Sequence, residues 1–317
     1  MVLDVFLFLI GLVILYYGAE WLIRGASSLA LQHGIRPIII GLTIVALGTS
    51  MPEFLVNAVA AVSDEPDLAL GNIIGSNIAN IALILGASAL VLPISVTPTI
   101  LRKEYPMMLA TMVVFYLLAL DGVISQWNGL LLVGCLLAIG LYLFIDERNS
   151  DPLMEEMDPE VQAGDPDAST LAKTAFLVGG TVGLAGGAQL MVHSAVTIAN
   201  TMGVDHVVIG LTIVAIGTSL PELAASMVGA MKSEADLSVG NVMGSNLLNI
   251  LFVVGVVSSM RPLDVSDASL SIHFPVMLAF AVLFLPLAWT GDRISRTEGG
   301  VLLAAFFGYM TYLVLHA

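Results

Sequence analysis

The chain has 317 residues, of which 58% are hydrophobic and only 11% are charged, and its mean hydropathy is +0.97. A soluble domain carries about 25% charged residues, so this composition excludes a water-soluble enzyme and indicates a protein that crosses the membrane many times. The formal net charge of −15 comes largely from residues 146–172, which hold nine acids and one base, and we expect no nucleic-acid partner. The single cysteine, Cys135, excludes an intrachain disulfide.

Ten apolar stretches have lengths near the roughly 20 residues that a helix needs to cross the hydrocarbon. In chain order they cover residues 4–23, 37–62, 70–92, 105–120, 129–145, 173–199, 207–231, 239–259, 274–290 and 299–316. The first stretch has no basic start and no evident small-residue cleavage site, so it is predicted to remain as a helix. The pattern predicts an all-α polytopic membrane protein with ten transmembrane helices.

The ten Lys and Arg residues predict how these helices are oriented. With the amino terminus outside, nine of the ten fall in inside loops and only Arg261 falls in an outside loop. This positive-inside bias predicts that both termini are outside and that the acidic segment 146–172 is cytoplasmic. We interpret that segment as a solvated linker, with a regulatory cation-binding loop as the alternative.

One block of sequence occurs twice, because residues 41–81 and 210–250 agree at 23 of 41 positions without a gap. The agreement lies mainly on Gly, Thr, Ser, Pro, Glu and Asn, which a lipid-facing helix would avoid. We therefore predict a first five-helix repeat (1–145), an acidic cytoplasmic linker (146–172) and a second five-helix repeat (173–317). Because five is odd, the second repeat is inverted, an arrangement typical of secondary transporters that work by alternating access.

Each repeat places a proline and a glutamate deep within a predicted helix. Pro52 and Pro221 lack an N–H and must interrupt their helices, which frees backbone carbonyls that cannot stay unpaired in hydrocarbon. Glu53 and Glu222 each cost about 2.5–3.5 kcal/mol at the bilayer centre, and no Lys or Arg is predicted at the same depth. Two such carboxylates need cations or protons.

A second polar helix in each repeat supplies neutral oxygens. The spacing of four residues puts Ser76 and Asn80 on one helix face, and Ser245 and Asn249 likewise. Asn77 and Asn246 are predicted to bond between helices, and Asn72 and Asn241 to cap the helix start. With the hydroxyls of Thr49, Ser50, Thr218 and Ser219, these residues form an all-oxygen anionic set. Such a set suits Ca2+ or Na+ and disfavours zinc or copper.

The charge of this set predicts the mode of transport. The empty site carries two negative charges, which are unfavourable to move across a low-dielectric barrier. One Ca2+ would neutralise them, as would two monovalent ions. A protein that changes its open face only when loaded is an exchanger, so we expect an antiporter, with no enzymatic activity and no cofactor.

The motifs GTSMPE at 48–53 with GSNIAN at 75–80, and GTSLPE at 217–222 with GSNLLN at 244–249, resemble the two alpha-repeats of the calcium/cation antiporter superfamily. The resemblance covers nearly the whole chain and is strongest to prokaryotic sodium/calcium exchangers. It implies a sodium/calcium exchanger-like fold, a location in a prokaryotic cell membrane and electrogenic exchange.

The same resemblance implies which residues bind the ions. Ca2+ would be held by Glu53, Glu222 and the carbonyls of Thr49 and Thr218. Na+ would be held by the carbonyls of Ala46 and Ala215 and by oxygens of Ser50, Ser76, Ser219 and Ser245, and the remaining repeat positions are Asn80 and Asn249. Some archaeal relatives and the potassium-dependent branch carry Asp at the position of Asn249, so this chain has one carboxylate fewer.

Na+-driven Ca2+ antiport is therefore the leading hypothesis, with Ca2+, Na+ and the lipid bilayer as partners and no obligate protein partner. A proton-driven or K+-linked Ca2+ antiporter is the alternative, because paired buried carboxylates can exchange a cation for protons. A cation channel is a third possibility, but two acids in an inverted repeat do not make a symmetric ring. The first and sixth spans are predicted to slide across the core as gating elements.

Overall fold

The computed structural model describes residues 2–63, 66–149, 164–203 and 215–316. In the first repeat the elements are α1 (Val2–His33), α2 (Pro37–Ile40), the π-helical turn η1 (Gly41–Val45), α3 (Ala46–Thr49), α4 (Met51–Val62), α5 (Pro66–Ala79), the π-helical turn η2 (Asn80–Ile84), α6 (Leu85–Val91), β1 (Ile94–Ser95), α7 (Pro98–Arg102), α8 (Glu104–Ala119), β2 (Val123–Ile124) and α9 (Gln126–Asn149). In the second they are α10 (Thr170–Thr201), α12 (Ala215–Thr218), α13 (Leu220–Met231), α14 (Ala235–Leu248), the π-helical turn η4 (Asn249–Val254), α15 (Gly255–Met260), β3 (Leu263–Asp264), the π-helical turn η5 (Ser269–His273), α16 (Phe274–Trp289), β4 (Arg293–Ile294) and α17 (Arg296–His316).

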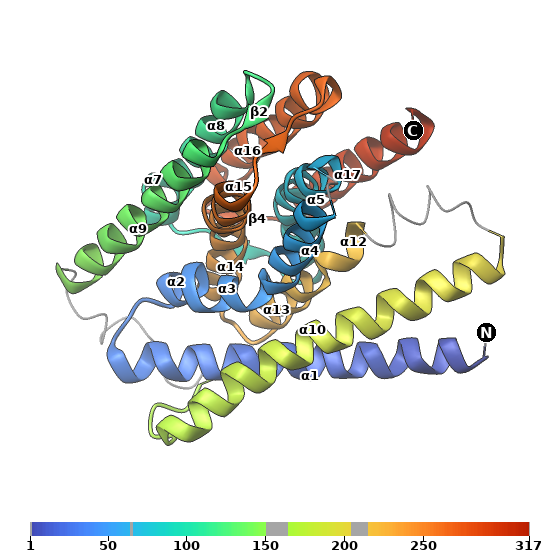
Figure 1. Cartoon of the computed structure of the whole chain (residues 1–317). Coiled ribbons are helices and arrows are strands. Elements are labelled where there is room, and N and C mark those ends of the chain that lie inside the picture. The colour runs from blue at the N-terminus through green and yellow to red at the C-terminus, as the bar shows by residue number, and fades with distance from the viewer. Residues whose placement is uncertain (1, 64–65, 150–163, 204–214, 317) are drawn as a thin grey trace.

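The described residues form a bundle of long apolar helices (Figure 1). Seven of its helical runs are long and apolar enough to cross a membrane, and the bent pair made of Pro37–Thr49 and Met51–Val62 gives an eighth. The predicted span 105–120 corresponds to α8, whose 16 residues rise about 24 Å. The predicted span 207–231 is described only from Ala215 onward. Each predicted span therefore coincides with a helix wherever the chain is described, which confirms the all-α, multi-span class.

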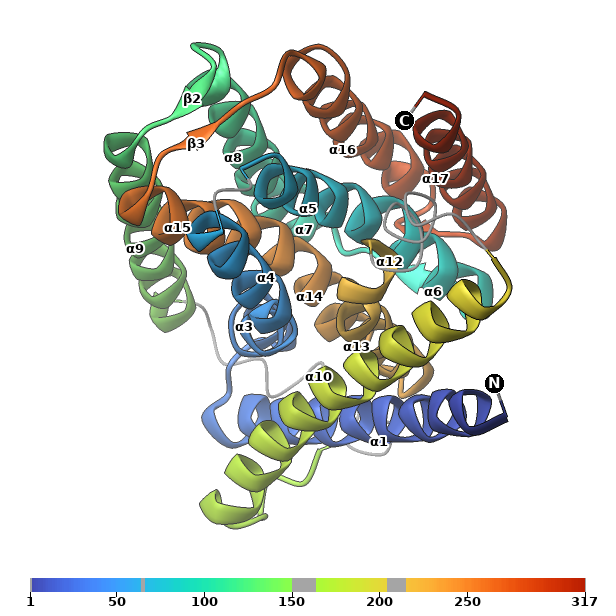
Figure 2. The ribbon, with the colours of Figure 1, turned by 45° about the vertical axis from the view of Figure 1, so that its right-hand side comes forward.

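The two polar helices of the repeats form the centre of the bundle. Of the apolar 18-residue stretch in each helical run, 83% is buried in Leu68–Val91 and 78% in Ala235–Met260. The corresponding share in Gln126–Glu147 is 17%. Figure 2 shows α5 and α14 surrounded by the other helices. The Asn, Ser and Gly residues of these runs are thereby shielded from lipid, where unpaired polar groups would cost several kcal/mol. The outer helices instead expose apolar side chains, such as Leu137 and Phe144 of α9.

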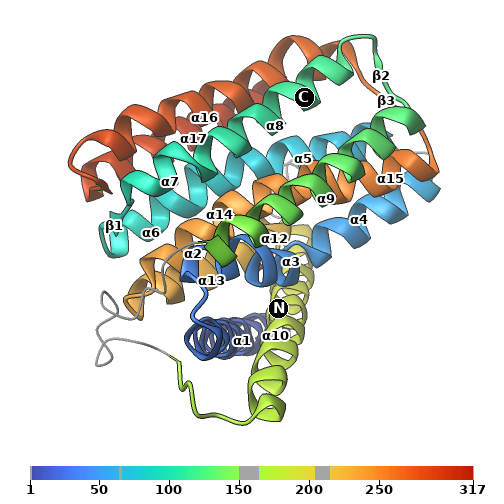
Figure 3. The same ribbon diagram turned by 90° about the vertical axis from the view of Figure 1, so that its left-hand side faces the viewer.

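Two short antiparallel strand pairs join the repeats to each other. Strand β1 pairs with β4, and β2 pairs with β3, so each pair takes one strand from each repeat. Figure 3 shows β1 at one end of the bundle and the β2–β3 pair at the other. The loops that contain β1 and β4 were both predicted to be inside, and those that contain β2 and β3 outside. The connectivity therefore agrees with the predicted number of crossings between these loops.

Helices α1 and α10 cross on one side of the bundle (Figure 1), and their backbones touch through glycine. A methyl group on Gly18 would lie 2.6 Å from the backbone nitrogen of Leu184, and one on Gly187 would lie 2.6 Å from the backbone nitrogen of Leu15. Gly18 matches Gly187, and Leu15 matches Leu184, by the same offset that relates the two copies of the repeated block. The crossing is thus approximately two-fold symmetric, and the inverted repeat includes these two helices.

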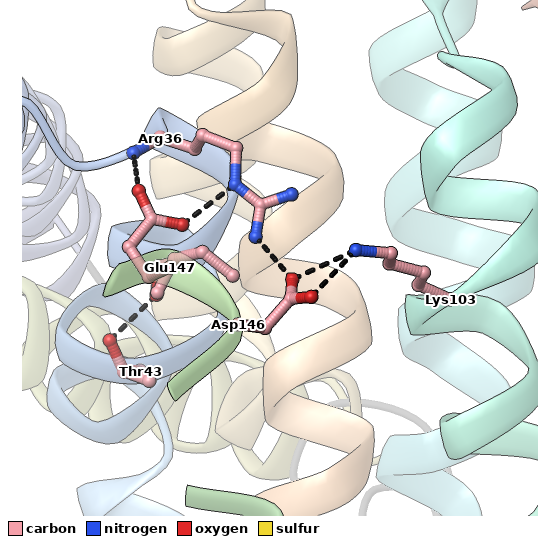
Figure 4. Close-up of polar contacts among 6 residues, drawn as sticks. Arg36, Thr43, Lys103, Asp146 and Glu147 are labelled. Atoms are coloured by element: carbon pink, nitrogen blue, oxygen red, sulfur yellow. Dashed lines mark hydrogen bonds and ion pairs between the residues drawn. The ribbon is translucent and has the colours of Figure 1, made fainter. Parts of the chain in front are cut away.

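Ion pairs connect the start of the broken helix to the outer helices (Figure 4). Arg36, just before α2, donates hydrogen bonds from its backbone N–H and its Nε to the carboxylate of Glu147, both at 2.7 Å, and from Nη2 to Asp146 at 2.9 Å. Lys103 binds both carboxylate oxygens of Asp146, at 2.8 and 2.9 Å. Hydrogen bonding to Asp146 raises the pKa of Lys103. The cluster joins the segments before α2 and α8 to the end of α9.

We expect Arg36→Ala to lower the free energy of unfolding by about 1–3 kcal/mol, because it removes the guanidinium from the carboxylate of Glu147, whose side chain is 13% exposed, while the backbone N–H of residue 36 still donates to that carboxylate. Thermal unfolding of the detergent-solubilised protein measures the change. The control is Arg102→Ala, which removes an exposed arginine of α7 and should shift stability by no more than about 0.5 kcal/mol. Equal shifts in both variants would contradict a stabilising role for the cluster.

Candidate ion-binding site

Both predicted helix interruptions occur, and both are located at a serine. Ser50 separates α3 from α4 with φ −83° and ψ 4°, and Ser219 separates α12 from α13 with φ −87° and ψ 3°. Each new helix has its proline, Pro52 or Pro221, in the first turn, where the missing N–H breaks no helical hydrogen bond. The first pair of half-helices is bent by 46°.

The two glutamates lie in the first turn of the new half-helices. Glu53 belongs to α4 and Glu222 to α13, and each is only 1% exposed. The positive end of a helix dipole stabilises negative charge at this position. Among the described residues neither glutamate forms an ion pair with Lys, Arg or His. Ser50, three residues before Glu53, contacts Glu222, so the half-helices that carry the two acids meet.

Serine and threonine of the first broken helix contact the second repeat. The Ser50 hydroxyl donates to Oε1 of Glu222 at 3.2 Å, and Thr49 Oγ1 lies 3.4 Å from Ser245 Oγ. Thr49, Ser50 and Ser245 are at most 1% exposed. These contacts bring four of the predicted ligand residues into one buried cluster.

The second polar helices place their predicted ligands at a change of helical geometry. Asn80 begins η2 and Asn249 begins η4, so the helix widens to a π-helical turn at both positions. Such turns occur frequently at functional sites, and no sequence pattern indicated them. Asn80 Nδ2 donates to Asn246 Oδ1 at 3.3 Å, which links α5 and η2 to α14. Ser76, Ser245 and both Asn residues are buried.

Asn72 and Asn241 were predicted as helix caps, and this prediction was wrong. Both lie inside helices, because α5 begins at Pro66 and α14 at Ala235. Their carbonyl oxygens accept hydrogen bonds from the other repeat: Thr49 donates to Asn241 at 3.1 Å, and Thr218 to Asn72 at 3.4 Å. The two bonds are symmetry equivalents. They orient the threonines beside the site. Both the threonine and the asparagine are the same in the two repeats, and this agreement was the sequence signal that could have revealed the two bonds.

Several buried polar atoms of this cluster have no hydrogen-bond partner among the described residues. They include both carboxylate oxygens of Glu53, Oε2 of Glu222, Oγ of Ser76 and Ser219, Oδ1 of Asn80 and both amide atoms of Asn249. An unpaired buried polar atom costs about 1–3 kcal/mol, so a group of them indicates a bound ligand. Most of the unpartnered atoms are oxygens, the atoms that Ca2+ and Na+ prefer.

The remaining predicted ligands are less completely described. The Ala46 carbonyl accepts a hydrogen bond from the backbone N–H of Ser50 at 2.9 Å, and it lies 3.3 Å from the Thr49 hydroxyl, which donates to Asn241. Thr218 is partly buried. Ala215 begins α12, but its side chain and residues 210–214 of the second motif lie outside the described residues. Within the described residues, no group of three or more His, Cys, Asp or Glu side chains could hold a metal ion. Two carboxylates completed by neutral oxygens fit this finding.

A bundle of membrane-spanning helices with two broken helices and an all-oxygen buried cluster defines a secondary cation transporter. The sequence model of the family described as "Sodium/calcium exchanger protein" matches residues 3–145 and 172–315. The chain is 41% identical to CaxA of Alkalimonas amylolytica over 96% of its length and 97% of the relative. It is 36% identical to the inner membrane protein YrbG of Escherichia coli, over 99% and 97% of the two chains.

Comparison with solved structures indicates the same family. A structure of the sodium-calcium exchanger NCX_Mj superposes with a TM-score of 0.82 at 31% identity, covering 98% of this chain and 99% of that one. The chain belongs to the sodium/calcium exchanger family, and it is a multi-pass membrane cation antiporter.

Proposed function

We propose that the protein exchanges Na+ for Ca2+ across the membrane by alternating access, with both ions bound midway through the bilayer. The observation that carries the proposal is the pair of buried carboxylates, Glu53 and Glu222, which have unpartnered oxygens and no basic partner among the described residues. Ca2+ takes roughly 6–8 oxygens in a flexible arrangement. Two carboxylates with nearby hydroxyls, amides and carbonyls can supply them.

We assign the ligands in two neighbouring sets. Ca2+ is bound by Glu53 and Glu222 together with the carbonyls of Thr49 and Thr218. Na+ is bound by oxygens of Ser50, Ser76, Ser219 and Ser245 and by the carbonyls of Ala46 and Ala215, with Asn80 and Asn249 completing the site. Because both sets share one cluster, Ca2+ and Na+ would compete, which is what exchange requires.

Neutral oxygens around the carboxylates favour Na+ over H+ as the driving ion. Asn249 is 1% exposed, and neither of its amide atoms has a partner among the described residues. An amide does not take up and release protons in the physiological range, but its oxygen can coordinate Na+. The relatives support the same choice, because MaX1 of Methanosarcina acetivorans, 30% identical over 96% of this chain and 97% of the relative, is named a sodium/calcium exchanger.

We further propose the arrangement of the chain in the membrane. Two five-helix repeats, 1–145 and 173–317, are joined by the acidic linker 146–172, which faces the cytoplasm, and both termini face outward. The charge distribution over the loops supports this orientation. The membrane is the plasma or inner membrane of a prokaryote, in line with the relative YrbG, which is named an inner membrane protein.

The test is Ca2+ uptake into proteoliposomes driven separately by outward gradients of Na+, H+ and K+. We expect uptake with the Na+ gradient and a return to the background level when Na+ is equal on both sides. Uptake driven by H+ alone would overturn the proposed driving ion. A Ca2+ current without any counter-ion gradient would indicate a channel.

A further inference from the structure

The backbone carbonyl of each site glutamate is bonded to the side chain of a buried asparagine, but the two asparagines occupy different places in the fold. Asn57, one turn after Glu53 in α4, donates from Nδ2 to the carbonyl of Glu53 at 2.7 Å. Asn241, in α14, donates from Nδ2 to the carbonyl of Glu222 at 3.4 Å and to Oγ of Ser226 at 3.0 Å. These residues are at most 2% exposed, so bulk water does not compete for the bonds.

One difference between the repeats accounts for this arrangement. By the offset of the repeated block, Asn57 corresponds to Ser226 and Asn72 corresponds to Asn241. In the second repeat the serine accepts the amide of Asn241, which holds α13 against α14. In the first repeat Asn57 makes its bond within α4, and the buried Nδ2 of Asn72 has no partner among the described residues. Glu53 is therefore fixed from inside its own half-helix, whereas Glu222 is fixed from a neighbouring helix.

Asn241 also joins the two repeats. Its Oδ1 accepts the hydrogen bond from Thr49 at 3.1 Å, so one side chain contacts the broken helix of each repeat. Asn72 accepts the equivalent bond from Thr218 at 3.4 Å, but its amide nitrogen adds nothing to it within the described part of the chain. The two asparagines occupy equivalent positions and hold different numbers of groups.

We propose that Asn57 and Asn241 are positioning residues for Ca2+ binding, and that Asn241 keeps the two halves of the site in register. The inference rests on the Ca2+-binding function proposed above. Neither side chain belongs to the assigned ligands, but each fixes the backbone from which a ligand carboxylate projects. A binding constellation needs its groups held to within about 0.5 Å. Loss of Asn241 would release Thr49 and the half-helix of Glu222 together.

The first test compares the two equivalent asparagines by calorimetric titration of the detergent-solubilised protein with Ca2+. Asn241→Ala should raise the Kd for Ca2+ at least about tenfold, because it removes three hydrogen bonds. Asn72→Ala removes one and should raise the Kd about threefold. Thermal unfolding without Ca2+ monitors the fold of both variants. Equal increases in Kd would overturn the role of Asn241.

The second test stays within the first repeat, so it holds even where Asn241→Ala does not fold. Asn57→Ala should raise the Kd about fivefold, and Asn57→Ser only about twofold, because the new hydroxyl can accept the amide of Asn72 as Ser226 accepts that of Asn241. In the Asn57→Ser background, Asn72→Ala should therefore cost at least about tenfold, against about threefold in the unmodified chain. Equal costs in the two backgrounds would overturn the role of Asn57.

A control variant and the unmodified protein complete the set. Ser258→Ala removes a buried hydroxyl of α15 that bonds only the carbonyl of Val254 among the described residues, at 2.6 Å, and should leave the Kd within about twofold. A tenfold increase in this variant would mean that any loss of buried polar packing weakens Ca2+ binding. If the unmodified protein binds no Ca2+, the proposed function fails together with this inference. If it binds Ca2+ and the asparagine variants do not follow the expected order, only the positioning roles are wrong.

Discussion

Replacing Glu53 or Glu222 by Gln is expected to reduce Ca2+ exchange at least 100-fold while the protein stays folded. Gln has nearly the same shape as Glu, but each variant removes one of the two negative charges of the site. Removing one partner of a buried ion contact costs about 3–5 kcal/mol, and about 2.7 kcal/mol already corresponds to 100-fold. Gradient-driven uptake of radioactive Ca2+ into proteoliposomes measures the loss, and size-exclusion chromatography monitors the fold.

A third buried glutamate provides the control. Glu104, at the start of α8, is also 1% exposed and has one unpartnered carboxylate oxygen, but the charges near it are Arg36, Lys103 and Asp146 of the ion-pair cluster. Glu104→Gln should therefore leave exchange close to that of the unmodified protein. Retained uptake in both site variants would show that the ions bind elsewhere. Equal losses in all three variants would show only that the bundle needs its buried acids.

The sequence was sufficient to predict the helix interruptions because their cause is local. Pro52 and Pro221 prevent continuation of the helix wherever the chain places them, and Glu53 and Glu222 stand out because carboxylates are rare in apolar segments. The start of the second polar helix is also determined locally. Pro66 stands at the first position of α5, a recognised start signal. Its use would have placed Asn72 inside the helix and corrected the capping prediction.

Other parts of the site could not be predicted because they depend on how distant segments pack. The bonds from Thr49 to Asn241 and from Ser50 to Glu222 join residues separated by 192 and 172 positions. Periodicity identifies which residues share a face of one helix, but it does not show which helix faces them. The same limit applied to the bond from Asn241 to Ser226, which forms only once α14 packs on α13.

The contact between α1 and α10 lies between these two cases. The sequence matched these helices only by their rank, as the first and sixth spans, and predicted that they slide across the core. The glycines that form the crossing recur by the offset of the repeat, so Gly18 and Gly187 could have been identified as a pair. Their need for close backbone approach follows only from the structure. Whether the two helices slide remains a prediction.

Gly187→Leu is expected to reduce exchange at least tenfold and to lower the free energy of unfolding by about 1–3 kcal/mol. The first added carbon would lie 2.6 Å from the backbone nitrogen of Leu15, which cannot rotate away, so α10 must separate from α1. The control is Gly140→Leu, on the exposed side of α9. Outside its own helical turn no described atom lies within 4 Å of the added carbon, so stability should be unchanged or slightly higher. Uptake assays and thermal unfolding in detergent measure both effects. Unchanged exchange in Gly187→Leu would mean that transport does not require α1 and α10 to remain in backbone contact.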